Sequence, residues 1–421
     1  MTPLNQSDPI KLVLTCDLGA SLNKILAQIY PDGVPFLITL SPEVADVEKE
    51  SVKGLAVEAS AQNAAWVGIG LEYYVLGDLA RTVFAGTSAV RDLKYQYALP
   101  KLASLVWLAC RHFKVEEAEV YVYLLLPPGE KKDGEKLGKQ LYLALKQGIM
   151  TPTGRLKLRQ RNFYVSNEGA GVLSHRWQTL AGAYSRQRIG MLMLGYRNAS
   201  FMLIEGGSQT LAESTDLGMN WLVERFVNRT AVGLSKDDSS VVKALVLAAI
   251  GEFNDLRSLS RKTKPTEIDT DLADFQESLN LVRREYCRAL LRWIRNIASV
   301  DEILICGGTG EFVHKELTEY FTQEQIPIVW NGGVKIPANL DTKNLGNRLA
   351  DVWISHLNHI EMLDANFGYE RKQPLVPEPA KEPKLEPLPQ VKLEPEIKKP
   401  IGETRPNHDP WKNFLPMKEG I

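Results

Sequence analysis

Four short motifs in this sequence of 421 residues combine glycines with side chains that bind phosphate or move protons. The first follows an apolar stretch and contains Asp17, Gly19, Ala20, Ser21 and Lys24. Gly19 lets the backbone approach a phosphate closely, turn N–H groups bind anionic oxygens, and Lys24 adds a positive charge. Asp17 is suited to holding Mg²⁺, directly or through its water ligands. The pattern predicts a phosphate-binding turn, although taken alone it fits an ordinary hairpin turn better.

The second and third motifs lie near the middle of the chain. Glu168 precedes a Gly-Ala-Gly turn where a strand is expected to open into a helix, so it can orient or deprotonate a water molecule. The alternative is a glutamate that faces solvent in a turn. The third motif has a strand–glycine–strand layout, as in a second phosphate loop, and its turn contains Gly195, Tyr196, Arg197 and Asn198.

The fourth motif is a glycine-rich turn between an apolar strand and a helix, at Gly307, Gly308, Thr309 and Gly310. Because glycines carry no side chain, such a turn can bring bare backbone against a flat ligand. Gly-rich strand-to-helix turns are common in α/β proteins, so this motif has little specificity by itself.

Strand-like and helix-like stretches alternate along the chain, which predicts an α/β architecture. Strands are expected at 11–16, 35–39, 65–69, 71–75, 119–126, 156–165, 188–194, 200–205, 302–306 and 326–330. Helices are expected at 97–113, 217–229, 239–258, 272–298, 311–322 and 345–362.

Composition narrows the class of protein. The chain has 50 Lys and Arg against 51 Asp and Glu, so we do not expect direct nucleic-acid binding. Arg155, Lys157, Arg159 and Arg161 alternate along one expected strand, and we favour a solvated sheet edge there over a contact with DNA or an acidic adaptor. No apolar run is long enough to span a membrane, and no secretory signal is visible. The scattered cysteines indicate a reducing, cytoplasmic compartment.

Residues 371–421 hold 11 of the 23 prolines, separated mainly by Lys and Glu, which predicts a disordered tail. Trp411, Phe414 and Leu415 lie near its end. We interpret them as a short motif that docks in a groove of a partner, or as a segment that folds back loosely on the body.

In this order, the four motifs resemble the duplicated, ribonuclease H-like fold of actin, the sugar kinases and the heat-shock ATPases. Within that superfamily the sequence resembles the ParM/StbA-type bacterial actin-like ATPases of plasmid segregation. CDLGASLNK resembles their first phosphate loop, VSNEGAGVL their strand with the catalytic Glu, DLGMNWLVERF their connecting helix and ILICGGTGEFV their adenosine motif. The resemblance covers residues 10–368 and leaves out the tail.

The resemblance implies two actin-like domains, 10–186 and 187–368 with a closing helix, around an interdomain nucleotide cleft. The ends, 1–9 and 369–421, are expected to be disordered. The implied cofactors are ATP or GTP with Mg²⁺ on Asp17, and the implied catalytic residue is Glu168. Nucleotide contacts are implied for Asp17, Gly19, Ala20, Ser21, Lys24, Gly195, Tyr196, Arg197, Asn198, Glu224, Gly307, Gly308, Thr309 and Gly310. Subunits would stack head to tail into a filament, and a separate adaptor would link it to DNA or another cargo.

The sequence departs from the family pattern in four places, one of which is Tyr196 where the second loop usually has its second Gly. Met193 stands where an Asp helps to hold the metal, and Mg²⁺ does not bind a thioether. Asn198-Ala199-Ser200 replaces the usual Thr-Thr-Asp, and Asn167 precedes the catalytic Glu where a Pro is usual. These departures predict slow hydrolysis or an altered ligand.

Two other functions remain as alternatives. One is a nucleotide-binding scaffold with little catalysis that recruits partners through its tail. The less favoured one is a small-molecule kinase, which needs a substrate pocket that no motif announces.

Overall fold

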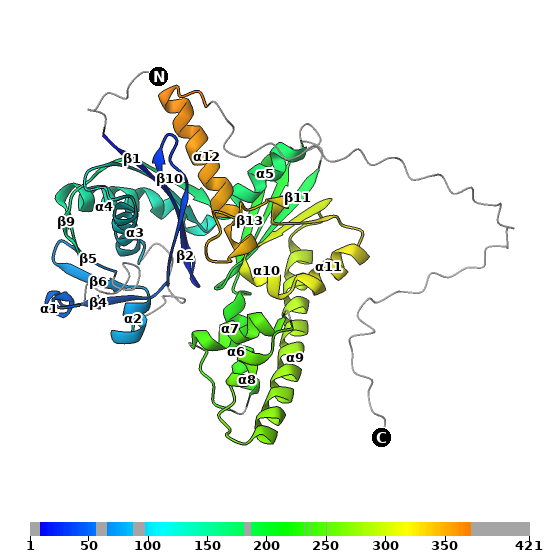
Figure 1. Cartoon of the computed structure of the whole chain (residues 1–421). Helices are drawn as coiled ribbons and strands as arrows, with labels where there is room; N and C mark the ends of the chain where they lie inside the picture. The colour runs from blue at the N-terminus through cyan, green and yellow to red at the C-terminus, as the bar shows by residue number, and fades with distance from the viewer. Residues whose placement is uncertain are drawn as a thin grey trace, which may run out of the picture. The chain divides into compact units, whose positions relative to one another are not determined.

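The computed structural model describes residues 9–55, 65–86, 97–180, 187–230, 232–236, 238–249 and 251–371 (Figure 1). The chain divides into two compact units, 1–371 and 372–421. The second unit lies outside the described residues, and so do the expectations for residues 1–8 and for Trp411, Phe414 and Leu415.

The last residues of the first unit pack on its body. The Tyr369 hydroxyl donates a hydrogen bond to Asp32, and the Arg371 guanidinium pairs with Asp364. Tyr30 donates its hydroxyl to the same Asp364, at 2.9 Å. The compact unit therefore ends at Arg371, two residues beyond the start of the expected tail at 369.

The first large sheet combines an antiparallel meander with two parallel strands. Its order is β10-β7-β1-β2-β3, and its strands are β1 (Lys11–Leu18), β2 (Asn23–Tyr30), β3 (Phe36–Leu40), β7 (Glu119–Leu126) and β10 (Arg159–Asn167). The predicted strands at 11–16, 35–39 and 119–126 are confirmed. No strand was predicted at β2, because buried Asn23 and Gln28 interrupt its apolar pattern.

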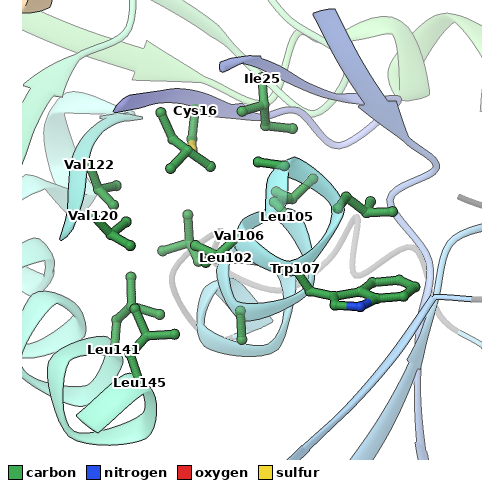
Figure 2. Close-up of a cluster of buried hydrophobic side chains, with 14 of the residues drawn as sticks. Cys16, Ile25, Leu102, Leu105, Val106, Trp107, Val120, Val122, Leu141 and Leu145 are labelled. Carbon is green, nitrogen blue, oxygen red and sulfur yellow. The ribbon is translucent and has the colours of Figure 1, made fainter. Parts of the chain in front are cut away.

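Side chains alternate between the two faces of β1, and each face meets a different helix layer. Leu12, Leu14 and Cys16 join the core formed with α3 (Ala98–Phe113) and α4 (Gly134–Gln147). Figure 2 shows Cys16, with Val120 and Val122 of β7, pointing into that core toward α3 and α4. The predicted helix at 97–113 is confirmed as α3.

Thr15, on the opposite face of β1, meets a histidine pair on α12 (Ala350–Phe367), formed by His356 and His359. The Thr15 hydroxyl lies 3.1 Å from His356 Nδ1 and 3.3 Å from His359 Nδ1, and His356 Nε2 lies 3.1 Å from Gln28 Oε1. Since that amide oxygen only accepts, His356 carries its proton on Nε2, and Thr15 donates to His356 while accepting from His359. Burial lowers the pKa of each imidazole to about 3, so both stay neutral.

The second large sheet repeats the topology of the first. Its order is β13-β12-β11-β14-β15, and its strands are β11 (Arg188–Leu194), β12 (Ala199–Glu205), β13 (Ser208–Thr215), β14 (Glu302–Cys306) and β15 (Ile328–Trp330). β11 to β13 form an antiparallel meander, and β14 and β15 extend the sheet in parallel beyond β11. This repetition confirms the expected duplicated α/β fold.

A smaller sheet is attached to the first half of the chain. Its order is β4-β6-β5-β8-β9, with β4 (Val44–Val47), β5 (Trp66–Ile69), β6 (Glu72–Leu76), β8 (Ile149–Thr151) and β9 (Gly154–Leu156), accompanied by α1 (Lys49–Val52) and α2 (Asp78–Val83). The predicted hairpin of 65–69 and 71–75 is confirmed as β5 and β6. The predicted basic strand face is wrong, because Arg155 lies on β9 of this sheet, whereas Arg159 and Arg161 lie on β10 of the first sheet.

Helices complete the second half of the chain, and Figure 1 shows a helical group, drawn in green, that includes the long α9. The group consists of α6 (Met219–Arg229), α7 (Ser239–Ala249), α8 (Asn254–Ser258) and α9 (Pro265–Ile297). Two further helices, α10 (Gly308–Phe312) and α11 (His314–Gln323), follow later in the chain and are drawn in yellow. The helix predicted at 239–258 is two helices, because the chain turns at Gly251, with φ of +90°. Short 3₁₀ turns lie at η3 (Pro128–Asp133), η5 (Asn331–Gly333) and η6 (Gly346–Leu349). No helix in the described part of the chain is long and apolar enough to cross a membrane.

Candidate functional site

The first phosphate motif is the hairpin turn between β1 and β2. Asp17 lies opposite Lys24 in the strand register, and Lys24 Nζ lies 2.6 Å from Asp17 Oδ2. Both side chains are nearly buried, which strengthens the attraction between their charges. Only glycine fits at position 19, because a Cβ there would lie 2.4 Å from the Leu22 carbonyl oxygen. The turn is therefore tight, and the Asp17–Lys24 ion pair joins the two strands beside it.

The second phosphate motif occupies the equivalent place in the second large sheet, as the turn between β11 and β12. The Gly195 N–H donates to the Asn198 carbonyl at 2.9 Å and closes the turn. The Gly195 carbonyl accepts from the Met219 N–H at 3.2 Å and from Thr309 Oγ1 at 2.8 Å. This turn, which is the third motif of the sequence, is thus joined to the fourth motif through the Gly195 carbonyl.

The glycine-rich turn after β14 lies against the end of β11. Gly307 has φ of +95°, and a Cβ on it would lie 2.3 Å from the Leu194 carbonyl oxygen. A residue with a side chain is therefore excluded by both conformation and space. Gly310 packs beside Trp330, and α10 begins at Gly308.

Glu168 follows β10 and begins the turn into α5 (Ala170–Leu180), as predicted. Its N–H donates to the Leu126 carbonyl of β7 at 2.9 Å, and Gly169 takes φ of +86°. The Glu168 side chain is half-buried. The backbone therefore places this carboxylate beside the carboxyl ends of β7 and β10.

Asp351, near the start of α12, accepts hydrogen bonds from the turn that follows Glu168. Its Oδ2 accepts from the Gly169 N–H at 2.7 Å, and its Oδ1 accepts from the Gly171 N–H at 2.9 Å. A Cβ on Gly171 would lie 2.5 Å from the Asp351 carbonyl oxygen, so glycine is needed for α5 and α12 to meet. The pKa of the Asp351 carboxyl is raised to about 6, mainly by burial. The charges of Asp17 and Glu168 also raise the pKa, and the hydrogen bonds from the Gly169 and Gly171 N–H groups lower it.

Arg348, in η6, connects the first and fourth motifs. Its Nη2 donates to Ser21 Oγ at 3.2 Å, and its carbonyl accepts from Lys24 Nζ at 2.9 Å. Its Nε lies 3.4 Å from the point where a Cβ on Gly308 would stand. A guanidinium therefore lies between the first phosphate turn and the glycine-rich turn after β14.

The four motifs meet around the Cys306 thiol at the end of β14. Burial raises the pKa of this thiol well above its usual value. The carboxylates of Asp351, Glu168 and Asp17 raise the pKa further, and the Lys24 ammonium lowers it. Charged groups from the first and second motifs and from α12 therefore all act on this one buried thiol of the fourth motif.

The second loop is also tied to the first large sheet. Arg197 Nη2 lies 2.6 Å from Glu130 Oε1 of η3, the turn that follows β7. The Glu130 side chain is 5% exposed and that of Arg197 is 18% exposed. This ion pair joins the two halves of the duplicated fold beside the candidate site.

Not every predicted residue is placed with this group. Glu224 is exposed on α6, where it pairs with Lys236 at 3.0 Å, and its contact with a nucleotide stays a prediction. Tyr196 and Asn198 lie in the second loop, and Ala20 and Ser21 lie in the first. Their contacts with a nucleotide stay predictions.

Three residues of the site, Arg348, Asp351 and Glu130, were missed from the sequence. No motif surrounds them, because they meet the four turns only in the folded chain. One signal was available, since Asp351 is the single carboxylate in the otherwise apolar run 349–354. A lone acid on a buried helix face indicates a polar partner inside the protein.

The donor atoms do not fit a divalent cation held by protein oxygens on both sides of the site. Asp17 is paired with Lys24, and both oxygens of Asp351 accept backbone N–H groups. Across from them, Cys306 Sγ lies 3.4 Å from Met193 Sδ, and Mg²⁺ prefers oxygen to sulfur. Among the residues that the structure describes, no group of three or more His, Cys, Asp or Glu side chains is arranged to hold a metal.

Comparison with solved structures identifies the fold. An archaeal actin homolog matches with a TM-score of 0.54 and 13% identity, over 84% of this chain and 99% of that chain. A ParM filament from Clostridium botulinum matches at 0.53 and 14% identity, and Bacillus thuringiensis ParM with ADP at 0.53 and 15%, each over 84% of this chain and 99% of that chain. This chain has the ParM-type actin-like fold.

The resemblance predicted from the four motifs is therefore confirmed for the fold. In the actin-like fold of this chain, both phosphate motifs are the first hairpin turns of the two duplicated sheets. The B. thuringiensis ParM was solved with AMPPNP as well as with ADP, and the archaeal homolog with ADP. No protein-family model and no curated protein matches the sequence.

Proposed function

We propose that this chain binds ATP or a closely related nucleotide between its two phosphate turns and assembles head to tail into filaments. Its task is the segregation of DNA, or a cytoskeletal role derived from it, with a separate adaptor for the cargo. The observation that carries the proposal is the set of contacts that join the four turns. Lys24 pairs with Asp17 and donates to the Arg348 carbonyl, Asp351 holds the turn after Glu168, and Thr309 donates to the Gly195 carbonyl. Groups from opposite ends of the chain meet there, at the turns that the resemblance assigns to a nucleotide.

The roles of the residues follow from their chemistry. Lys24 supplies positive charge to the phosphates, and the tight turn at Gly19 supplies backbone N–H groups. Gly308 carries no side chain, so a base or a ribose can approach its backbone beside Arg348. Glu168 orients the attacking water and accepts its proton, because it is a half-buried carboxylate at the carboxyl ends of β7 and β10, on the turn that Asp351 holds.

Hydrolysis is proposed to be slow. Met193 stands where the resemblance expects an Asp that helps to hold the metal ion, so the second loop lacks that oxygen ligand. Slow hydrolysis would favour long-lived polymers, since subunits would keep the nucleotide with which they assembled. Filament formation itself is supported by the fold, which this chain shares with ParM and Alp12 proteins solved as filaments.

A second candidate function is a nucleotide-binding scaffold with negligible turnover. The sulfur pair of Met193 and Cys306 favours it, because neither atom supports a hard cation or a developing oxyanion. The two functions differ in the rate of phosphate release and agree on nucleotide binding.

The test combines binding, assembly and turnover on the full chain. ATP and AMPPNP binding are measured by calorimetry, assembly by pelleting and light scattering, and phosphate release in parallel. Lys24→Ala should weaken nucleotide binding by about 10- to 100-fold, as expected for one charge-assisted contact. Lys53→Ala is the matched control, since Lys53 is exposed and pairs only with Glu50 in its helix turn. Failure of the wild type to bind ATP under any condition would overturn the proposal, whereas binding without phosphate release would select the scaffold.

A further inference from the structure

The second phosphate loop carries an arginine where a nucleotide-binding loop usually presents small residues. Arg197 belongs to a four-residue turn between two strands, a position from which a long polar side chain normally reaches into solvent. Here its side chain is only 18% exposed. Keeping a guanidinium out of water is costly, so something must hold it in place.

Glu130 holds it. The Glu130 carboxylate is 5% exposed and accepts from Arg197 Nη2 at 2.6 Å, in the short-distance range of charge-assisted hydrogen bonds. Glu130 lies in η3, directly after β7, and β7 runs parallel to β1 with Leu125 opposite Asp17. The Arg197 head is therefore fixed near the strand ends that carry the first phosphate turn.

The same loop is unsuited to a hard metal ion. Met193 precedes it and faces Cys306, so two sulfur atoms occupy the end of β11 and β14. A planar guanidinium fork binds phosphate oxygens well, and unlike an aspartate it needs no cation between itself and the anion. Met193 thus stands at the position of the expected metal ligand, and the loop itself carries the positively charged Arg197.

We propose that this chain binds its nucleotide without depending on a divalent cation, and that Arg197, preset by Glu130, takes part of the phosphate charge that Mg²⁺ would otherwise neutralise. The inference rests on the proposed nucleotide binding and deepens it. It concerns the cation requirement of nucleotide binding, and it holds whether hydrolysis is slow or absent.

The test is calorimetric titration of the full chain with ADP, once in excess Mg²⁺ and once in excess EDTA. The wild-type dissociation constant should differ by less than about threefold between the two buffers. Arg197→Gln should weaken ADP binding at least tenfold in EDTA, and Arg197→Lys should retain most of it. Met193→Asp should make binding depend on Mg²⁺, because it restores an oxygen ligand at the end of β11.

Arg188→Gln is the matched control. Arg188 lies on the same strand, at the end remote from the loop, and forms a similar ion pair with Glu205 at 2.6 Å. This variant should bind ADP as the wild type does. A tenfold loss of wild-type affinity in EDTA would overturn the inference, as would normal ADP affinity of Arg197→Gln, which would make the Arg197–Glu130 pair purely structural.

The design separates this inference from the proposed function. If the wild type binds no ADP in either buffer, the nucleotide proposal itself has failed. If it binds only in Mg²⁺, nucleotide binding stands and cation independence is refuted. Because this comparison uses wild-type protein alone, it remains decisive even if Arg197→Gln does not fold.

Discussion

Replacing Gly307 by alanine should damage the candidate site through both backbone strain and overpacking. Gly307 has φ of +95° and ψ of 156°, a region that residues with a Cβ rarely occupy. Its new Cβ would stand 2.3 Å from the Leu194 carbonyl oxygen and 2.8 Å from the Leu194 carbonyl carbon. These are backbone atoms of β11, so they can retreat only if the strand end moves.

Two costs add in this variant. The backbone strain is about 1–3 kcal/mol, and overpacking against a fixed neighbour adds about 1–3 kcal/mol. We therefore expect Gly307→Ala to lower the free energy of unfolding by about 2–6 kcal/mol. Nucleotide affinity should fall as well, because displacement of Leu194 carries with it Gly195, whose carbonyl accepts from Thr309.

Gly206→Ala separates the two costs. Gly206 lies between β12 and β13 with φ of +58°, and a Cβ there would meet nothing within 4 Å. This variant should lose about 1–2 kcal/mol from the left-handed conformation alone and keep its nucleotide affinity. Urea unfolding and ADP titration of both variants make the comparison. Equal losses in the two variants would refute the packing argument at Gly307.

Four further outcomes are expected. Asp17→Ala should weaken nucleotide binding and abolish nucleotide-dependent assembly, and equal assembly across an ATP titration would show that Asp17 has no such role. Glu168→Ala should keep nucleotide affinity and slow phosphate release, with longer-lived polymers; loss of binding in its place would make Glu168 structural. Acid should destabilise the fold. The two histidines of α12 have a pKa near 3 when folded and 6.5 when exposed, so together they lower the free energy of unfolding by about 4 kcal/mol between pH 7 and pH 5. Asp351, with its raised pKa of about 6, increases the free energy of unfolding by about 1 kcal/mol over the same range. Urea midpoints that stay constant from pH 7 to pH 5 would contradict this balance. Deleting residues 372–421 should leave the first unit folded and able to bind ADP but impair the cellular task, and the double variant Trp411→Ala/Phe414→Ala should reproduce the impairment; wild-type location and bundling in both would leave the tail without a function.

The sequence alone determined the features that depend on neighbouring residues. Apolar runs of the length of β7 or α3 form the same element in many contexts, and their bounds were predicted almost to the residue. The glycine turns could be predicted as well, because a glycine directly after an apolar strand indicates a tight turn. In the structure, backbone atoms leave no room for a Cβ at Gly19 or Gly307. The order of these turns along the chain was sufficient to predict the duplicated actin-like fold.

Local patterns failed where the outcome depended on distant contacts. β2 was missed because its polar Asn23 and Gln28 are buried through hydrogen bonds to Ser41 and Pro31 carbonyls, which a period count does not detect. The basic run from Arg155 to Arg161 looked like one strand face, yet the chain passes from one sheet to another within it.

The tertiary structure decided which charges meet at the site. Asp351 holds Gly169 across 182 positions, Arg348 reaches Ser21 across 327, and Glu130 holds Arg197 across 67. The residues next to a carboxylate or a guanidinium in the sequence do not indicate its partner, because in the unfolded chain water solvates each charged group without one. Folding removes this water, and each buried charged group then needs a polar partner. Only the tertiary structure brings the two together.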